Sequence, residues 1–246
     1  MVRTGRLRFR PTLVPTVMVV AMLPVLIGLG VWQLQRLDWK ADLIARIEAR
    51  VAASPVAMPA SIDDPAAWDY RRVRVHGRFL PRSALILLNR THDGRPGGHL
   101  VAAFERTDTG TADGPAVGPP ILIDRGWVPD TTAAPTAWPV PDGDVFVEGI
   151  LRTPPPPGWF QPDNDPIAQH WYWLDLPAMA DALGVAPAPP MILEAAGGDG
   201  PPPIGDQTRL TLPNDHLQYA LTWFGLAAVL IAIYVVYHMR RDGAGG

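Results

Sequence analysis

Two long runs of uncharged, mostly apolar residues constrain this chain more than any other feature. Residues 12–34 form a run of 23 residues, and residues 217–237 form a second run of 21. A helix rises about 1.5 Å per residue, so the first run reaches roughly 34 Å, enough to cross the hydrocarbon core of a bilayer. We therefore predict transmembrane helices at residues 12–34 and 214–237.

The first run has one alternative interpretation, a cleaved signal peptide, because Arg3, Arg6, Arg8 and Arg10 precede it. Its apolar stretch is longer than the roughly 7–15 residues typical of a signal peptide, and no small-x-small cleavage site follows it. We therefore expect a retained membrane anchor.

Positive charge beside the two spans predicts their orientation. The first ten residues hold four arginines and no acid, and Arg240 and Arg241 follow the second span. The positive-inside rule places the segments 1–11 and 238–246 in the cytoplasm, so the central region should face the periplasm. The Arg-, Ala- and Pro-rich composition suggests a bacterium, hence a two-pass protein of the inner (plasma) membrane in contact with membrane lipid.

The charge and cysteine content exclude several classes of protein. The net charge of the chain is −3, and its basic ends contribute +5, which leaves −8 for the remainder. A domain this acidic is a poor candidate for binding nucleic acid. The chain has no cysteine, which excludes CxxC redox chemistry, thiolate copper sites, covalent c-type haem and disulfides.

Between the spans, the hydrophobic pattern changes from helical to strand-like. Residues 35–53 continue a helical pattern as an amphipathic extension. Residues 54–213 contain short runs rich in β-branched and aromatic residues, separated by Gly, Pro, Asp and Asn, and among these runs "RRVRVHGRF" at 71–79 and "ALILLNR" at 84–90 are expected to be separate strands. One short helix is expected at residues 177–183. The predicted fold is a membrane protein in which two transmembrane helices flank a mainly antiparallel β (α+β) extramembrane domain.

Motifs typical of enzymes are absent, and this lowers the expectation of catalysis. The sequence contains no GxSxG, HExxH, Walker or GxGxxG motif. Asp124, in "IDRGW", is a candidate acid for an envelope hydrolase, but a structural pair with Arg125 or another base explains it more simply. We expect His76, His92, His99 and His170 to be structural or solvated, and His238 to extend the basic cytoplasmic flank with Arg240 and Arg241.

His216 differs from the other histidines because it stands at the mouth of the second span, in "NDHLQYALTW". Pro213 blocks helical continuation upstream, Asn214 is a good N-cap, and His216 would then be the second helical residue. The positive end of the helix dipole disfavours an added proton, which leaves an imidazole lone pair able to coordinate a metal. Tyr219 and Trp223 follow on the same helix face.

The predicted topology brings the end of the first span to the same membrane interface as His216. Trp32, Gln33 and Arg36, followed by Trp39 and Lys40, could therefore face the aromatic residues beside His216. A metal ligand, aromatic walls and cations at one depth would suit a haem whose propionates meet Arg or Lys. The alternative is an ordinary aromatic belt with flanking cations, which unrelated membrane proteins also have.

The sequence resembles the surfeit-locus family of cytochrome c oxidase assembly factors. Five segments carry the resemblance in order along nearly the whole chain: "LGVWQLQRLDWKADLI" at 29–44, "RRVRVHGRF" at 71–79, "ILIDRGWVP" at 121–129, "HWYWLDLPAMADALG" at 170–184 and "NDHLQYALTWFGLA" at 214–227.

The resemblance implies a non-enzymatic chaperone that binds haem a and helps to insert it into subunit I of the oxidase. His216 would be the ligand of the haem iron, with Tyr219, Trp223, Trp32, Gln33 and Arg36 completing the cofactor site. Subunit I and haem a synthase would be the protein partners. An alternative is a membrane-anchored scaffold that docks oxidase subunits or haem a synthase without binding a cofactor.

Overall fold

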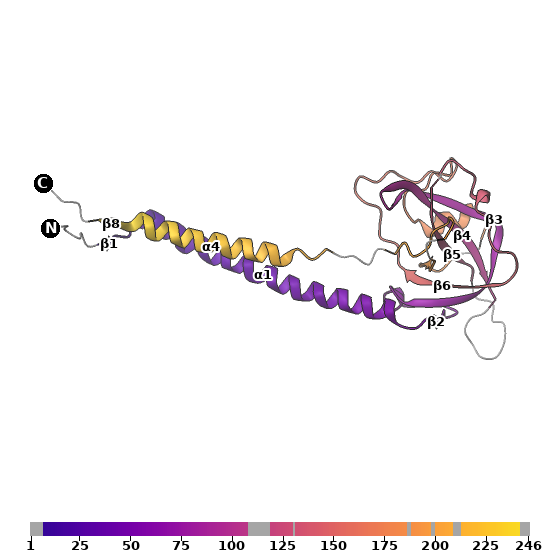
Figure 1. Ribbon diagram of the computed structural model, residues 1–246, viewed down its shortest axis with the longest axis horizontal. Helices are drawn as coiled ribbons and strands as arrows, with labels where there is room; N and C mark the ends of the chain where they lie inside the picture. The colour runs from indigo at the N-terminus through magenta and orange to yellow at the C-terminus, as the bar shows by residue number, and fades with distance from the viewer. Residues whose placement is uncertain are drawn as a thin grey trace. The chain divides into compact units, whose positions relative to one another are not determined.

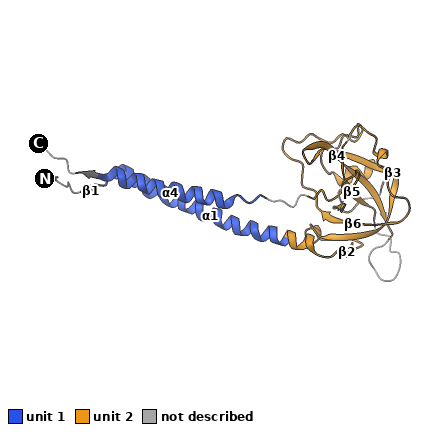
Figure 2. Ribbon diagram, in the orientation of Figure 1, with its two compact units in different colours: residues 1–46, 211–246 blue, residues 47–210 orange. Residues whose placement is uncertain are grey.

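The computed structural model divides the chain into two compact units (Figure 2). The first combines residues 1–46 with residues 211–246, and the second consists of residues 47–210. The structure describes residues 7–107, 119–129, 131–185, 188–197, 200–208 and 213–241.

The first unit is built on two helices from opposite ends of the sequence. Helix α1 spans Leu13–Ala52 and helix α4 spans His216–His238. Both are long and apolar enough to cross a membrane, as the two uncharged runs predict. Figure 1 shows α4 lying along α1, with the short paired strands β1 (Leu7–Phe9) and β8 (Met239–Arg241) next to them. The chain is therefore a membrane protein, and α1 continues as one helix well beyond its apolar run.

Contacts near the chain ends set the antiparallel register of α1 and α4. The hydroxyls of Thr16 and Tyr234 lie 2.8 Å apart, and Thr12 Oγ1 lies 2.9 Å from His238 Nε2. His238 is 1% exposed, and its Nδ1 donates to the Tyr234 carbonyl at 2.8 Å. His238 is thus a buried packing residue that joins the two helices, and not merely part of a basic flank.

Gly30 allows close approach of the helices towards their other end. A Cβ atom at this position would lie 2.5 Å from the ring of Phe224. Ala220 and Ala227, also on α4, are 1% and 5% exposed. Small residues at such positions let helix backbones approach closely in a membrane, where packing replaces the hydrophobic effect as the main source of association.

The second unit is a closed β barrel. Its strands pair in the order β3–β4–β5–β7–β6, and β6 pairs again with β3. Most pairs are antiparallel, whereas β5–β7 and the short β2–β3 pair are parallel, so the sheet is mixed. The strands are β2 (Val56–Ala57), β3 (Arg72–His92), β4 (Arg95–Arg106), β5 (Ile121–Val128), β6 (Val145–Arg152) and β7 (Ile192–Ala195).

Both faces of the central strands are buried. Along β4, Ala102 and Phe104 belong to one core cluster, whereas Val101 and Ala103 belong to another. Side chains alternate between faces along a strand, so the two clusters lie on opposite sides of the sheet. The second cluster includes Trp171 and residues of helix α3 (Leu176–Ala182), which lies one residue from its predicted bounds. The remaining short helices are α2 (Pro65–Trp68) and η1 (Pro135–Ala137).

One division of the predicted strands is wrong. The runs "RRVRVHGRF" and "ALILLNR" read as separate strands, but they form the single strand β3. Irregular register between Phe79 and Ala84, and again between Leu87 and Arg90, bends this strand. A bulged strand turns a barrel corner without ending, which is why the intervening Pro81 did not terminate it.

We predict that Gly30→Leu destabilises the helix pair by about 1–3 kcal/mol, because a larger side chain would force the Phe224 ring aside. Gly28→Leu is the matched control, since a Cβ there meets no atom within 4 Å. Thermal unfolding of the two full-length variants in the same detergent measures the difference. Equal melting temperatures would show that the close approach at Gly30 contributes no stability.

Candidate haem-binding site

His216 is the first residue of α4, and the residues before it differ from the expected cap. The N-cap is Asp215, whose side chain makes no capping hydrogen bond. The prediction that Asn214 caps the helix is therefore wrong. The Asn214 side chain instead donates from Nδ2 to the Leu37 carbonyl of α1 at 3.4 Å. Asn214 therefore bonds to the neighbouring helix α1 and does not cap α4. Capping rules read only the residues next to a helix end, so they cannot predict a bond to a distant part of the chain.

A hydrogen bond to Gln33 determines which imidazole nitrogen of His216 carries the proton. His216 Nδ1 lies 2.7 Å from the side-chain oxygen of Gln33 on α1. An amide oxygen only accepts, so Nδ1 must be the donor. In the neutral ring, Nε2 is then left with its lone pair. Metal-binding histidines are usually held in this way, with one nitrogen donating to an oxygen and the other facing the metal.

The aromatic residues near His216 are partly uncovered. Tyr219 is 57% exposed and Trp32 is 51% exposed, while Trp223 is half-buried. Within the described part of the chain, none of the three stacks on the His216 ring or bonds to it. These side chains therefore flank the histidine without closing over it.

Arg36 supplies a cation one helical turn beyond Gln33. Its guanidinium lies over the ring of Trp39, 4.3 Å from the centroid. The structure gives Arg36 no ion pair with a carboxylate among the residues it describes. Stacking on an aromatic ring holds an arginine in place while its donors remain available for an anion.

The structure thus brings one pair of the predicted site residues into direct contact, His216 and Gln33. Tyr219, Trp223, Trp32 and Arg36 lie on the same two helices, but no direct bond joins them to His216. Sequence reasoning missed Asn214 as an interhelix contact and Gly30 as the close-approach position. Gly30 lies opposite the bulky side chain of Phe224, and this pairing would have identified the close-approach position if the register of the two helices had been known.

A second group of polar residues lies in the β barrel, and it accounts for Asp124. Asp124 Oδ2 lies 2.7 Å from His99 Nδ1, and its Oδ1 accepts from the Gly126 backbone at 2.9 Å. Both carboxylate oxygens therefore take part in local bonds, as expected if Asp124 has a structural role and is not the acid of a hydrolase. Its basic partner is His99, whereas the sequence had suggested Arg125 or another base. Arg125 instead donates to the carbonyls of Trp138 and Pro139. The described residues contain no group of three or more His, Asp or Glu side chains able to hold a metal ion.

Comparison with known proteins places the chain in a family. The family model described as "SURF1 family" matches residues 20–228. The chain belongs to the SURF1 family. Surfeit locus protein 1 of Mus musculus and of Homo sapiens are each 37% identical over 87% of this chain, covering 72% and 74% of those proteins. A SURF1-like protein of Monosiga brevicollis is 34% identical over 88% of the chain and 84% of its own length.

Members of the SURF1 family are cytochrome c oxidase assembly factors, in agreement with the resemblance of the sequence motifs. The match includes the last part of the apolar run of α1, the whole barrel and the first half of α4. His216 and Gln33 both lie within it.

Next to Asp124 in the barrel, Glu194 makes a pH-dependent contribution to stability. Burial raises the pKa of this carboxyl, and the Asp124 charge adds to the effect, while the bond from Thr208 and the charge of Arg152 oppose it. A raised pKa in the folded state means that the folded protein holds this proton more tightly than the unfolded chain. The free energy of unfolding therefore falls as pH rises above about 4.3 through the raised pKa of Glu194.

We predict that Glu194→Gln removes the fall in unfolding free energy that ionisation of Glu194 causes at higher pH. A neutral amide has no charge to desolvate, and its oxygen can still accept from Thr208. The stabilisation of the variant relative to the unchanged protein should be larger at pH 7.5 than at pH 4.5, as measured by urea unfolding. Glu148→Gln is the control, since Glu148 pairs with Arg74 on an exposed surface. A difference that does not vary with pH would contradict the prediction.

Proposed function

We propose that this protein binds haem a between the adjoining parts of α1 and α4 and assists its insertion into subunit I of cytochrome c oxidase. The observation that supports this most strongly is the bond from His216 to Gln33, which leaves Nε2 with a free lone pair. A histidine used only to join two helices has no need of a free nitrogen, and His238 illustrates that case with both of its nitrogens bonded.

The residues around His216 fit a haem. Nε2 would supply a ligand for the haem iron, and Gln33 would fix the orientation of the imidazole and raise its basicity. Tyr219, Trp223 and Trp32 offer aromatic surface for the macrocycle, and Arg36 offers donors for a propionate. Gln33 therefore acts as a positioning residue for His216 in this proposal, and does not contact the haem itself.

The openness of the site suits a carrier that must release its cargo. Trp32 and Tyr219 are about half exposed, so neither encloses a ligand. One ligand and open aromatic surfaces would leave the site accessible from the bilayer, as sideways transfer of a haem to subunit I requires. Haem a synthase would be the source of the cargo. The arginines at both chain ends support cytoplasmic termini with the barrel on the opposite side of the membrane, and the Arg-, Ala- and Pro-rich composition supports a bacterial inner membrane.

We expect His216→Ala to abolish or strongly shift the haem a absorption spectrum of the protein purified from membranes in which haem a synthesis is co-expressed, because the iron loses its ligand. His170→Ala, which changes an exposed histidine of the barrel unit, should keep the spectrum. Equal spectra for His216→Ala and the unchanged protein would rule out His216 as the ligand. Haem absent from all three samples would favour the docking scaffold.

We expect Gln33→Leu to weaken haem a binding by about 10–100-fold, the usual cost of losing the partner that orients a metal-binding histidine. Gln33→Glu should preserve binding, because a carboxylate also accepts from Nδ1. It should also lower the reduction potential of the bound haem, because it makes the imidazole more electron-rich. Gln35→Leu is the matched control, an exposed glutamine two residues along α1. Binding unaffected by Gln33→Leu would remove Gln33 from the site.

A further inference from the structure

Three large apolar side chains of the barrel unit are almost completely exposed. Trp159 is 94% exposed, Phe160 is 96% exposed and Ile167 is 97% exposed. Single exposed apolar residues are ordinary, but two adjacent aromatic residues and an isoleucine in one loop are costly to leave in water. We call residues 158–170 the aromatic loop.

Hydrogen bonds within the aromatic loop hold these side chains outward. The side chain of Gln161 accepts from the Gly158 backbone at 3.0 Å and donates to the Tyr172 carbonyl at 2.6 Å. Asn164 accepts from the backbone of Tyr172 at 2.8 Å, and Asp165 accepts from that of Ile167 at 3.0 Å. Gln161 and Asn164 thus fasten the part of the loop with the aromatic pair to Tyr172, and Asp165 closes the turn with the isoleucine. A loop built in this way presents its apolar side chains at little cost in conformational entropy.

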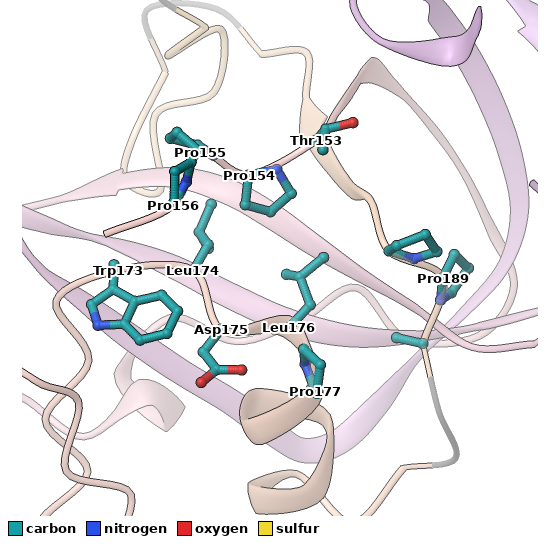
Figure 3. Close-up of a pocket in the computed structure, with 12 residues that line it drawn as sticks. Thr153, Pro154, Pro155, Pro156, Trp173, Leu174, Asp175, Leu176, Pro177 and Pro189 are labelled. Carbon is teal, nitrogen blue, oxygen red and sulfur yellow. The ribbon is translucent and has the colours of Figure 1, made fainter. Parts of the chain in front are cut away.

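An apolar groove begins where the aromatic loop begins. Pro154–Pro156 line one wall, and residues 173–177 line the opposite wall, with Pro189 and Pro190 completing it (Figure 3). Its volume is about 350 Å³. Trp173 connects the groove to the loop, because its carbonyl accepts from the Asn164 side chain at 3.1 Å. Proline walls are rigid, so the groove is preformed.

The charge around this surface indicates which partner fits. Residues 153–177, which form the aromatic loop and two walls of the groove, contain three acidic residues and no lysine or arginine, while Arg90 of β3 donates to the Tyr172 carbonyl at 3.4 Å. Segments that bind anionic lipid do so through clusters of Lys and Arg. The acidic residues therefore oppose docking to anionic lipid and favour a protein partner with basic side chains.

We infer that the aromatic loop and the proline-walled groove form a docking surface for an oxidase subunit that presents apolar side chains bordered by Lys or Arg. The inference rests on the oxidase partnership of the proposed function, but it uses residues outside the haem site. Trp159 and Phe160 are the anchors, since aromatic residues dominate the binding energy of protein interfaces. Asp163 contributes to the acidic rim.

The test uses the full-length protein in nanodiscs and purified detergent-solubilised cytochrome c oxidase from the same membranes. The double substitution Trp159→Ser with Phe160→Ser should weaken binding to the oxidase at least about tenfold. Asp163→Lys should weaken it several-fold, and this part of the loss should shrink at high salt. Phe146→Ser is the matched control, because Phe146 is an exposed aromatic residue of β6, 67% exposed. Equal affinity for the double variant and the unchanged protein would overturn the inference.

A fluorescent probe identifies the class of partner directly. The chain has no cysteine, so Ala168→Cys in the aromatic loop and Ala137→Cys in η1 each give one labelling site. Added oxidase should shield the label at residue 168 from a water-soluble quencher, but not the label at residue 137. Quenching of the residue 168 label by doxyl lipids before oxidase is added would assign the loop to the membrane and overturn the inference.

The haem a spectrum separates this test from that of the proposed function. The double variant should keep the haem a spectrum while it loses oxidase affinity. If oxidase shields the label at residue 168 but the protein never binds haem a, the docking surface is supported and the haem-carrier function is disproved.

Discussion

The hydrogen bond from His216 to Gln33 depends on two helices, drawn from opposite ends of the sequence, meeting in a single register. A slip of one residue along either helix would rotate one partner about 100° away from the other. The register is held at several levels: the Gly30–Phe224 contact lies near the bond, and the bonds of Thr12 and Thr16 lie far from it. The orientation of the imidazole is therefore a consequence of helix packing over the length of α4.

This dependence gives the small residues of the helices a role in function. Gly30 and Ala220 bind no ligand in the proposed site, but they permit the approach that brings Gln33 within reach of His216. Loss of close packing would therefore weaken the site without touching it. The barrel contributes differently, since the bond between His99 and Asp124 joins its strands β4 and β5, and its aromatic loop offers a surface to a partner.

Much of this architecture could be predicted from the sequence, because it rests on strong local signals. Uncharged runs of 23 and 21 residues indicate two spans, and alternating β-branched residues indicate the strands. The failures occurred where a distant partner determines the local structure. Asn214 reads as a cap until Leu37 is placed beside it, and His238 reads as part of a basic flank until Thr12 and Phe9 cover it. The continuous β3 strand was missed because closure of the barrel favours a bend over a break.

The residues of the candidate site could also be predicted from local signals, but the contacts between them could not. Residue type and position singled out His216, and the expected topology brought Gln33 to the same interface. No sequence rule could indicate that Gln33 bonds to Nδ1 of that histidine, which decides the role of each residue. In the proposed function, Gln33 therefore positions the histidine ligand and does not itself contact the cofactor.

The most direct test of this arrangement is the tautomer of His216, measured by ¹⁵N solid-state NMR of histidine-labelled, haem-free, full-length protein in bilayers at neutral pH. The structure predicts that the neutral form of the ring is protonated at Nδ1 with a bare Nε2, and that this preference is lost in Gln33→Leu. A ring protonated at Nε2 would contradict it, because the nitrogen proposed to bind iron would then already carry a proton.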